Sequence, residues 1–135
     1  MSQDLTNLKI WCAKPPIGLC VLFGSRAVNR ARADSDYDLA FRTTVVLAPL
    51  ERVRWQAILE DILNSDASIV FLTAHTDPVL GWEIVRAGQL MYEAQPGMWA
   101  SERLRLWHSY NATLPFRRGL AESLRRYAED VRRAS

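Results

Sequence analysis

Lysine, cysteine and long apolar runs are scarce in this chain of 135 residues. Two lysines accompany fifteen arginines, so the basic side chains favour bidentate pairing with phosphate or carboxylate over simple solubility. The two cysteines, Cys12 and Cys20, lack the spacing of metal ligands and lie among apolar residues, so we expect buried free thiols and no disulfide. No run approaches the roughly 18 apolar residues of a membrane span, and the N-terminal residues do not form a signal peptide. We therefore expect a cytoplasmic protein without a membrane partner.

The length suits one domain with a real core, but it is short for an enzyme that encloses two substrates. We expect a single domain over residues 1–135, with residues 98–135 as a helical extension and with a partner that completes the site. The net charge is +2, yet residues 98–135 carry eight arginines against four acidic residues, net +4. That charge is modest for 38 residues that would bind a phosphate backbone. The extension is therefore predicted to contact a partner or a second copy in a homo-oligomer, and not to read a nucleic acid sequence.

Apolar segments bounded by proline, glycine or small polar residues divide the chain into strands and helices. Strands are expected at residues 17–23, 37–46, 67–73 and 89–92, and helices at residues 4–13, 50–64, 78–87 and 98–113. Residues 25–33 are expected to begin a short helix or an ordered loop. Residues 17–23 are almost all apolar, which is typical of a strand buried on both faces of a sheet.

The extension begins after Pro96-Gly97 and is interrupted by Pro115. Beyond that proline, apolar residues recur at intervals of four, four, three and four, at Phe116, Leu120, Leu124, Tyr127 and Val131. This spacing predicts a second amphipathic helix. Four tryptophans are expected to anchor the core or an interface: Trp55, Trp82, Trp99 and Trp107.

A candidate anion site lies where the apolar run of residues 17–23 ends in Gly24-Ser25. A strand that ends this way and leads into a helix leaves amide N–H groups exposed, and glycine lets the backbone approach an anion closely. Phosphate oxygens could bind there, with Arg26, Arg30 and Arg32 within reach, although at least one of these arginines is expected to face water. We therefore predict phosphate binding by Gly24, Ser25 and Arg26.

Two carboxylates follow after an interval of ten residues, in the segment Asp36-Tyr37-Asp38-Leu39. In a strand, Asp36 and Asp38 share one face while Tyr37 and Leu39 share the other. Two acids on one face repel unless a cation lies between them, and oxygen ligands of this kind suit Mg²⁺ completed by phosphate oxygens and water. Each half of this pattern is common alone, in turns or in solvated strands, but the two halves together predict a metal-bound polyphosphate.

Gly24-Ser25, the ten-residue interval and Asp36-Tyr37-Asp38 resemble the signature of the polymerase-β-type nucleotidyltransferase superfamily. Residues 35–40 also resemble its small prokaryotic branch, the minimal nucleotidyltransferases, which are often encoded beside a HEPN-domain partner. The resemblance covers roughly residues 5–93 and includes the helix, glycine and strand of residues 83–93. It implies an α/β fold with a polymerase-β-like palm: a small mixed sheet with helices mainly on one side, plus the C-terminal helical extension. It also implies Mg²⁺ as cofactor, ATP or another NTP as substrate, and a HEPN-domain protein as partner.

Enzymes of the superfamily usually carry a third carboxylate on a later strand, and the resemblance aligns that position with Ser68. A serine hydroxyl offers a lone pair but no charge, so it is a weaker metal ligand and no general base. Asp66 could replace it from the same strand face, or it could be an ordinary turn residue after Asn64-Ser65. The resemblance therefore assigns catalysis to Asp36, Asp38, Asp66 and Ser68, with the metal on Asp36 and Asp38.

Two functions remain open. The intact Gly-Ser turn and the paired aspartates favour an enzyme that transfers a nucleoside monophosphate to a hydroxyl of a HEPN-domain partner, as the antitoxin of a toxin–antitoxin pair. The serine at position 68 favours a binding module of the same fold that neutralises the partner by contact. His75 and His108 are candidate bases, but no motif connects either histidine to the site.

Overall fold

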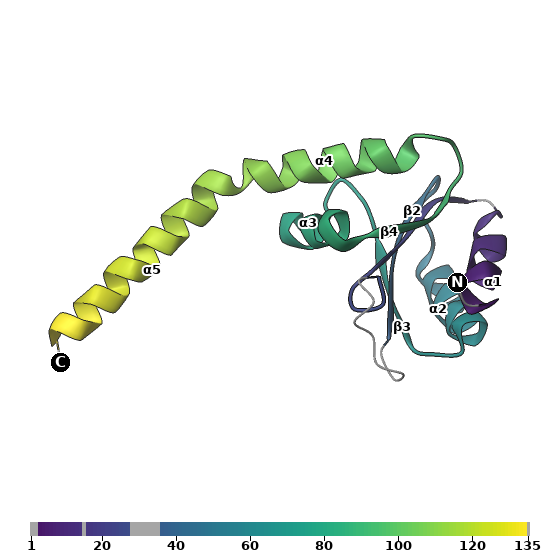
Figure 1. Ribbon diagram of the computed structural model, residues 1–135, viewed down its shortest axis with the longest axis horizontal. Helices are drawn as coiled ribbons and strands as arrows, with labels where there is room; N and C mark the ends of the chain where they lie inside the picture. The colour runs from purple at the N-terminus through teal and green to yellow at the C-terminus, as the bar shows by residue number, and fades with distance from the viewer. Residues whose placement is uncertain (1–2, 15, 28–35, 135) are drawn as a thin grey trace.

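The computed structural model describes residues 3–14, 16–27 and 36–134, which form a mixed sheet with helices and a long C-terminal arm (Figure 1). Its elements in chain order are α1 (Gln3–Cys12), β1 (Ile17–Phe23), β2 (Tyr37–Thr43), α2 (Pro49–Leu63), β3 (Ala67–Phe71), α3 (Pro78–Ala87), β4 (Gln89–Glu93), α4 (Met98–Ala112) and α5 (Leu114–Ala134). This order confirms the α/β prediction. Most of the expected helix or loop at residues 25–33 lies outside the described residues.

The sheet has the strand order β3-β2-β1-β4. β1 runs antiparallel to both of its neighbours, and β2 runs parallel to β3. Every residue of β1 is buried, because this strand lies inside the sheet and its side chains are apolar on both faces. The second strand ends at Thr43 and not at residue 46, since the pairing of β2 with β1 stops at the pair of Ile17 and Thr43.

Helices cover both faces of this sheet. One core contains Leu8 of α1 and Trp55 of α2, packed against alternate residues of the strands. The other contains Ile84 of α3 and Leu106 of α4, packed against the remaining strand residues. We expected helices mainly on one side, and the actual distribution is more even because β1 needs apolar cover on each face.

Both cysteines are buried free thiols, as predicted. Burial, together with contact with the Cys12 thiol, raises the pKa of Cys20 well above its ordinary value. Cys20 is therefore a neutral core side chain.

The end of α3 shows why a glycine follows this helix. Gly88 has an ordinary φ of −72°. A Cβ atom at this position would clash with the carbonyl oxygen of Ile84 and would lie 2.8 Å from Cγ1 of Val21. Close packing of the turn between α3 and β4 on β1 therefore requires glycine here.

The C-terminal extension consists of α4, which packs on α3, and α5, which projects away from the sheet (Figure 1). Gly81 of α3 lies against Leu106 of α4, and Leu106 is 1% exposed. α5 has no buried residue. The expected division into two helices is confirmed, but it lies at Thr113: α4 ends at Ala112 and α5 begins at Leu114, so Pro115 lies in the first turn of α5. No helix in the described part of the chain is long and apolar enough to cross a membrane.

Candidate functional site

The first half of the site is the turn that follows β1. Gly24 has a φ of +74°, in the left-handed region that favours glycine. The N–H of Ala27 donates to the carbonyl oxygen of Gly24 over 3.2 Å, which closes the turn. A Cβ atom on Gly24 would clash with Oδ2 of Asp38 and would lie 3.0 Å from Cγ of the same residue. The turn backbone therefore lies directly against a carboxylate.

The second half of the site is the start of β2, where burial alternates along the chain. Tyr37 and Leu39 are buried in the core, at 6% and 0% exposure, whereas Asp36 is exposed and Asp38 is partly buried. Asp38 pairs with Phe23, the last residue of β1, so the register brings this acid to the Gly24 turn. Asp38 therefore lies on the face opposite to Tyr37 and Leu39. The place of Asp36 on the same face stays a prediction.

Burial, and secondarily the negative charge of Asp36, raises the pKa of Asp38 above its ordinary value. The chemistry of this donor set fits Mg²⁺, because two neighbouring carboxylate oxygens repel each other until a cation neutralises them. Within residues 3–14, 16–27 and 36–134, no three His, Cys, Asp or Glu side chains gather closely enough to hold one metal ion. The protein ligands available at this place are therefore a pair of carboxylates.

Ser68 stands beside the pair. In the parallel register of β2 and β3, Ser68 lies opposite Asp38, so both side chains extend from the same face of the sheet. Asp66 precedes β3, and its carbonyl oxygen accepts the N–H of Tyr37 over 3.0 Å. Asp66 thus lies next to Asp36, but it does not complete a group of three ligands. Ser68 therefore lies beside Asp38, as its predicted place at the third-acid position requires. The catalytic roles of Ser68 and Asp66 stay predictions.

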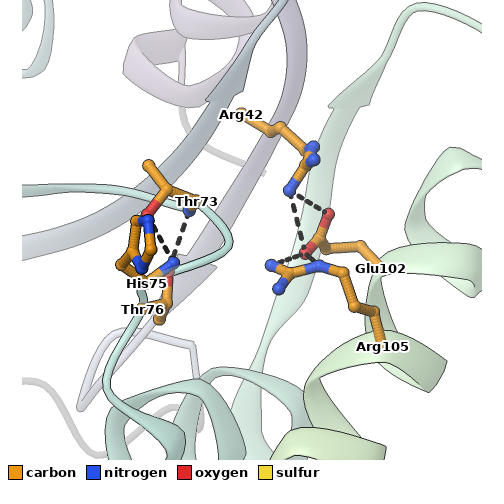
Figure 2. Close-up of polar contacts among 6 residues, drawn as sticks. All are labelled: Arg42, Thr73, His75, Thr76, Glu102 and Arg105. Atoms are coloured by element: carbon orange, nitrogen blue, oxygen red, sulfur yellow. Dashed lines mark hydrogen bonds and ion pairs between the residues drawn. The ribbon is translucent and has the colours of Figure 1, made fainter.

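The guanidinium of Arg26 lies 4.0 Å from the centre of the Tyr37 ring, so this arginine stacks on an aromatic residue beside the turn. Phosphate binding by Arg26 stays a prediction. Arg30 and Arg32 lie outside the described residues. His75 follows the far end of β3, in a loop where its N–H donates to Oγ1 of Thr73 over 3.0 Å (Figure 2).

Sequence reasoning missed an ion cluster at the opposite end of β2. Glu102 of α4 is 5% exposed, and its carboxylate pairs with Arg42 of β2 at 3.0 Å and with Arg105 of α4 (Figure 2). Nε of Arg105 also donates to Glu102 over 2.7 Å. The only signal in the sequence is the three-residue spacing of Glu102 and Arg105, which is common on solvated helices. The cluster attaches α4 to the strand that carries Asp38 and directly follows Asp36.

Comparison with known families identifies the family of this chain. Residues 7–97 match the family described as polymerase beta, nucleotidyltransferase. The chain belongs to this family. The matched stretch contains the Gly24 turn and both aspartates, and it ends just before α4. No curated protein is significantly similar to the chain.

Solved structures share the fold of this nucleotidyltransferase. A toxin–antitoxin crystal structure with AMP-PNP has a TM-score of 0.76 and 19% sequence identity, over 92% of this chain and 98% of that chain. Tri-AMPylated Shewanella oneidensis HEPN toxin in complex with MNT antitoxin gives a TM-score of 0.70 and 21% identity, over 91% and 98% of the two chains. The toxin–antitoxin MntA–HepT gives 0.69 and 21%, over 90% and 98%. These coverages extend the likeness beyond residues 7–97 into the C-terminal extension.

Proposed function

We propose that the chain transfers a nucleoside monophosphate from ATP to a hydroxyl of a HEPN-domain protein, and so acts as the antitoxin of a toxin–antitoxin pair. The observation that carries this proposal is the Gly24 turn, whose backbone lies against Asp38, a carboxylate on which the charge of Asp36 also acts. The AMP-PNP in one structurally similar toxin–antitoxin, and the AMPylated HEPN toxin in another, support the choice of nucleotide and acceptor.

In the proposed step, the acceptor oxygen forms a bond to the α-phosphorus of ATP. The bond between the α-phosphorus and the oxygen that bridges it to the β-phosphorus breaks, and pyrophosphate leaves with the electron pair. The acceptor proton passes to Asp66 or, without its help, to water. Amide N–H groups of the Gly24-Ser25 turn bind phosphate oxygens, aided by the charge of Arg26. Asp36 and Asp38 would hold Mg²⁺, which would supply positive charge to the phosphate oxygens and to the acceptor oxygen. Because Ser68 is neutral, the position of the third carboxylate carries no charge in this chain.

The alternative is a binding module that neutralises the partner by contact alone. The neutral Ser68 opposite Asp38 favours this function, because nucleotide binding needs only the turn and the two aspartates, whereas transfer also needs a route for the acceptor proton. Binding and transfer are therefore expected to separate, with measurable ATP binding and slow transfer.

Transfer of radiolabel from ATP labelled at the α-phosphate to the purified partner tests the proposal. Label should appear on the partner only with Mg²⁺, and D36N/D38N should abolish it. D61N/E83Q, which removes two exposed acids elsewhere, is the matched control and should label the partner normally. A stable complex with no label under any condition supports the binding module instead. If labelling is brisk and D66N stops it, Asp66 is the third acid.

A further inference from the structure

A cavity opens at the carboxyl ends of the parallel strands β2 and β3, between residues 44–47 and residues 72–74. Its volume is about 320 Å³, at the lower end of the range of about 300–1,000 Å³ that is usual for small-molecule sites. In open sheets whose parallel strands are joined by a helix, ligands bind outside the carboxyl ends of the strands. Asp38 lies near the other end of β2, roughly 16 Å from Thr43 at about 3.3 Å per residue. The cavity is therefore separate from the candidate nucleotide site.

The wall that α2 contributes to this cavity carries a positive charge in a fixed place. The guanidinium of Arg52 lies 4.8 Å from the centre of the Phe71 ring. Phe71 in turn packs against Phe41 and Trp55, with ring centres 6.3 Å and 5.8 Å away. Among the residues that the structure describes, no carboxylate forms an ion pair with Arg52. The aromatic rings therefore position this guanidinium, and its N–H donors can still bind an anion.

The rest of the described cavity wall is free of negative charge, because none of its residues is Asp or Glu. Arg42 also lines the cavity. The carboxylate of Glu102 is shared between Arg42 and Arg105, so these three residues together keep a net positive charge. The hydroxyl oxygen of Thr73, another wall residue, accepts the N–H of His75 (Figure 2). The hydroxyl proton of Thr73 is therefore left to donate to a ligand.

We infer that this cavity is a second ligand site, which binds a small organic phosphate ester with the phosphate group on Arg52. A guanidinium pairs with phosphate through two parallel N–H donors, and the Thr73 hydroxyl adds a further donor. The cavity is about ten times the volume of one water molecule in the liquid, which is about 30 Å³, so a bare phosphate ion would leave most of it empty. The apolar side chains of Val45 and Leu47 in its wall suit the organic part of an ester.

NMR titrations of the full-length protein, followed by amide chemical shifts, test this inference. The probes are phenyl phosphate, ribose 5-phosphate and inorganic phosphate, each added without Mg²⁺ at constant ionic strength. The amides of residues 44–47 and 72–74 should shift saturably with at least one ester, which should bind about 10-fold tighter than inorganic phosphate. The two esters distinguish an aromatic organic part from a sugar. Equal affinities for all three probes would overturn the assignment to an organic ester.

Variants of α2 test the role of the guanidinium. R52Q should weaken ester binding about 10-fold or more and leave the fold intact, because Arg52 is exposed. R52K keeps the charge but loses the planar pair of donors, so its affinity should lie between those of R52Q and the wild type. R54Q is the matched control, since Arg54 lies on the same helix, pairs with Glu51 and is not part of the cavity wall. It should change the affinity by less than about 2-fold.

The inference is independent of nucleotide transfer. D36N/D38N should bind the ester as the wild type does, because neither aspartate lines the cavity. The inference is wrong if R52Q binds the ester as tightly as the wild type, or if none of the three probes shifts the amides of residues 44–47 and 72–74. Shifts confined to residues 24–27 would likewise overturn it, because they would place all phosphate binding at the Gly24 turn.

Discussion

Replacing Gly24 with alanine isolates the contact on which the candidate site depends. The φ of +74° at this position is unfavourable for alanine by about 1–2 kcal/mol. The new Cβ would also clash with Oδ2 of Asp38, and forcing atoms into a packed place adds about 1–3 kcal/mol. We therefore expect G24A to lower the free energy of unfolding by about 2–5 kcal/mol, the sum of these two effects.

Two comparisons separate the backbone effect from the clash. Gly97 has a φ of +91° and nothing within 4 Å of its Cβ position, so G97A should show only the backbone effect of about 1–2 kcal/mol. In a D38A background, G24A should also lose the clash, which gives a coupling of about 1–3 kcal/mol between the two positions. Urea unfolding followed by tryptophan fluorescence measures the free energies of unfolding of the wild type, G24A, G97A, D38A and G24A/D38A.

The reasoning fails if G24A and G97A cost the same and D38A leaves the cost of G24A unchanged. In that case the Gly24 turn does not lie against the carboxylate, and the phosphate site loses its main support.

Three further changes test the site and its surroundings. D36N/D38N should abolish Mg²⁺-dependent ATP binding in calorimetry without unfolding the protein, and undiminished binding would rule out this ligand pair. S68D should raise the rate of nucleotide transfer, because it places a carboxylate opposite Asp38, and an unchanged rate would show that the third charge is not limiting. E102Q should lower the free energy of unfolding by about 1–2 kcal/mol, since the buried carboxylate faces two arginines that are 40% and 34% exposed. E122Q, in the exposed pair with Arg126, should change it by less than about 0.5 kcal/mol.

The sequence predicts most helices and strands, and also the two halves of the candidate site, because both depend on local patterns. The run of residues 17–23, the Gly24 turn and the Asp36-Tyr37-Asp38 alternation each follow from neighbours within a few residues. Residues 44–46 were wrongly expected in a strand because Val45 and Val46 are β-branched. They are 56% and 91% exposed, since the paired strands end before them.

Features formed between distant elements could not be predicted in the same way. The place of Ser68 beside Asp38 depends on the register of two strands that are separated by a helix. The burial of Glu102 depends on where α4 crosses the end of β2, and a helical glutamate three residues before an arginine gives no sign of it. The cover on both sheet faces likewise depends on the packing of α3 and α4, which periodicity alone does not orient.

The packing of α4 also sets the smallest fragment that can fold. The family match stops at residue 97, but the core around Ile84 continues through Trp99 and Leu106 of α4. A fragment cut at the end of the match would expose Leu19, Val21 and Ile84 to water and would remove the ion partner of Arg42. Such a truncated protein is expected to aggregate, whereas a chain shortened only by α5 keeps both cores covered.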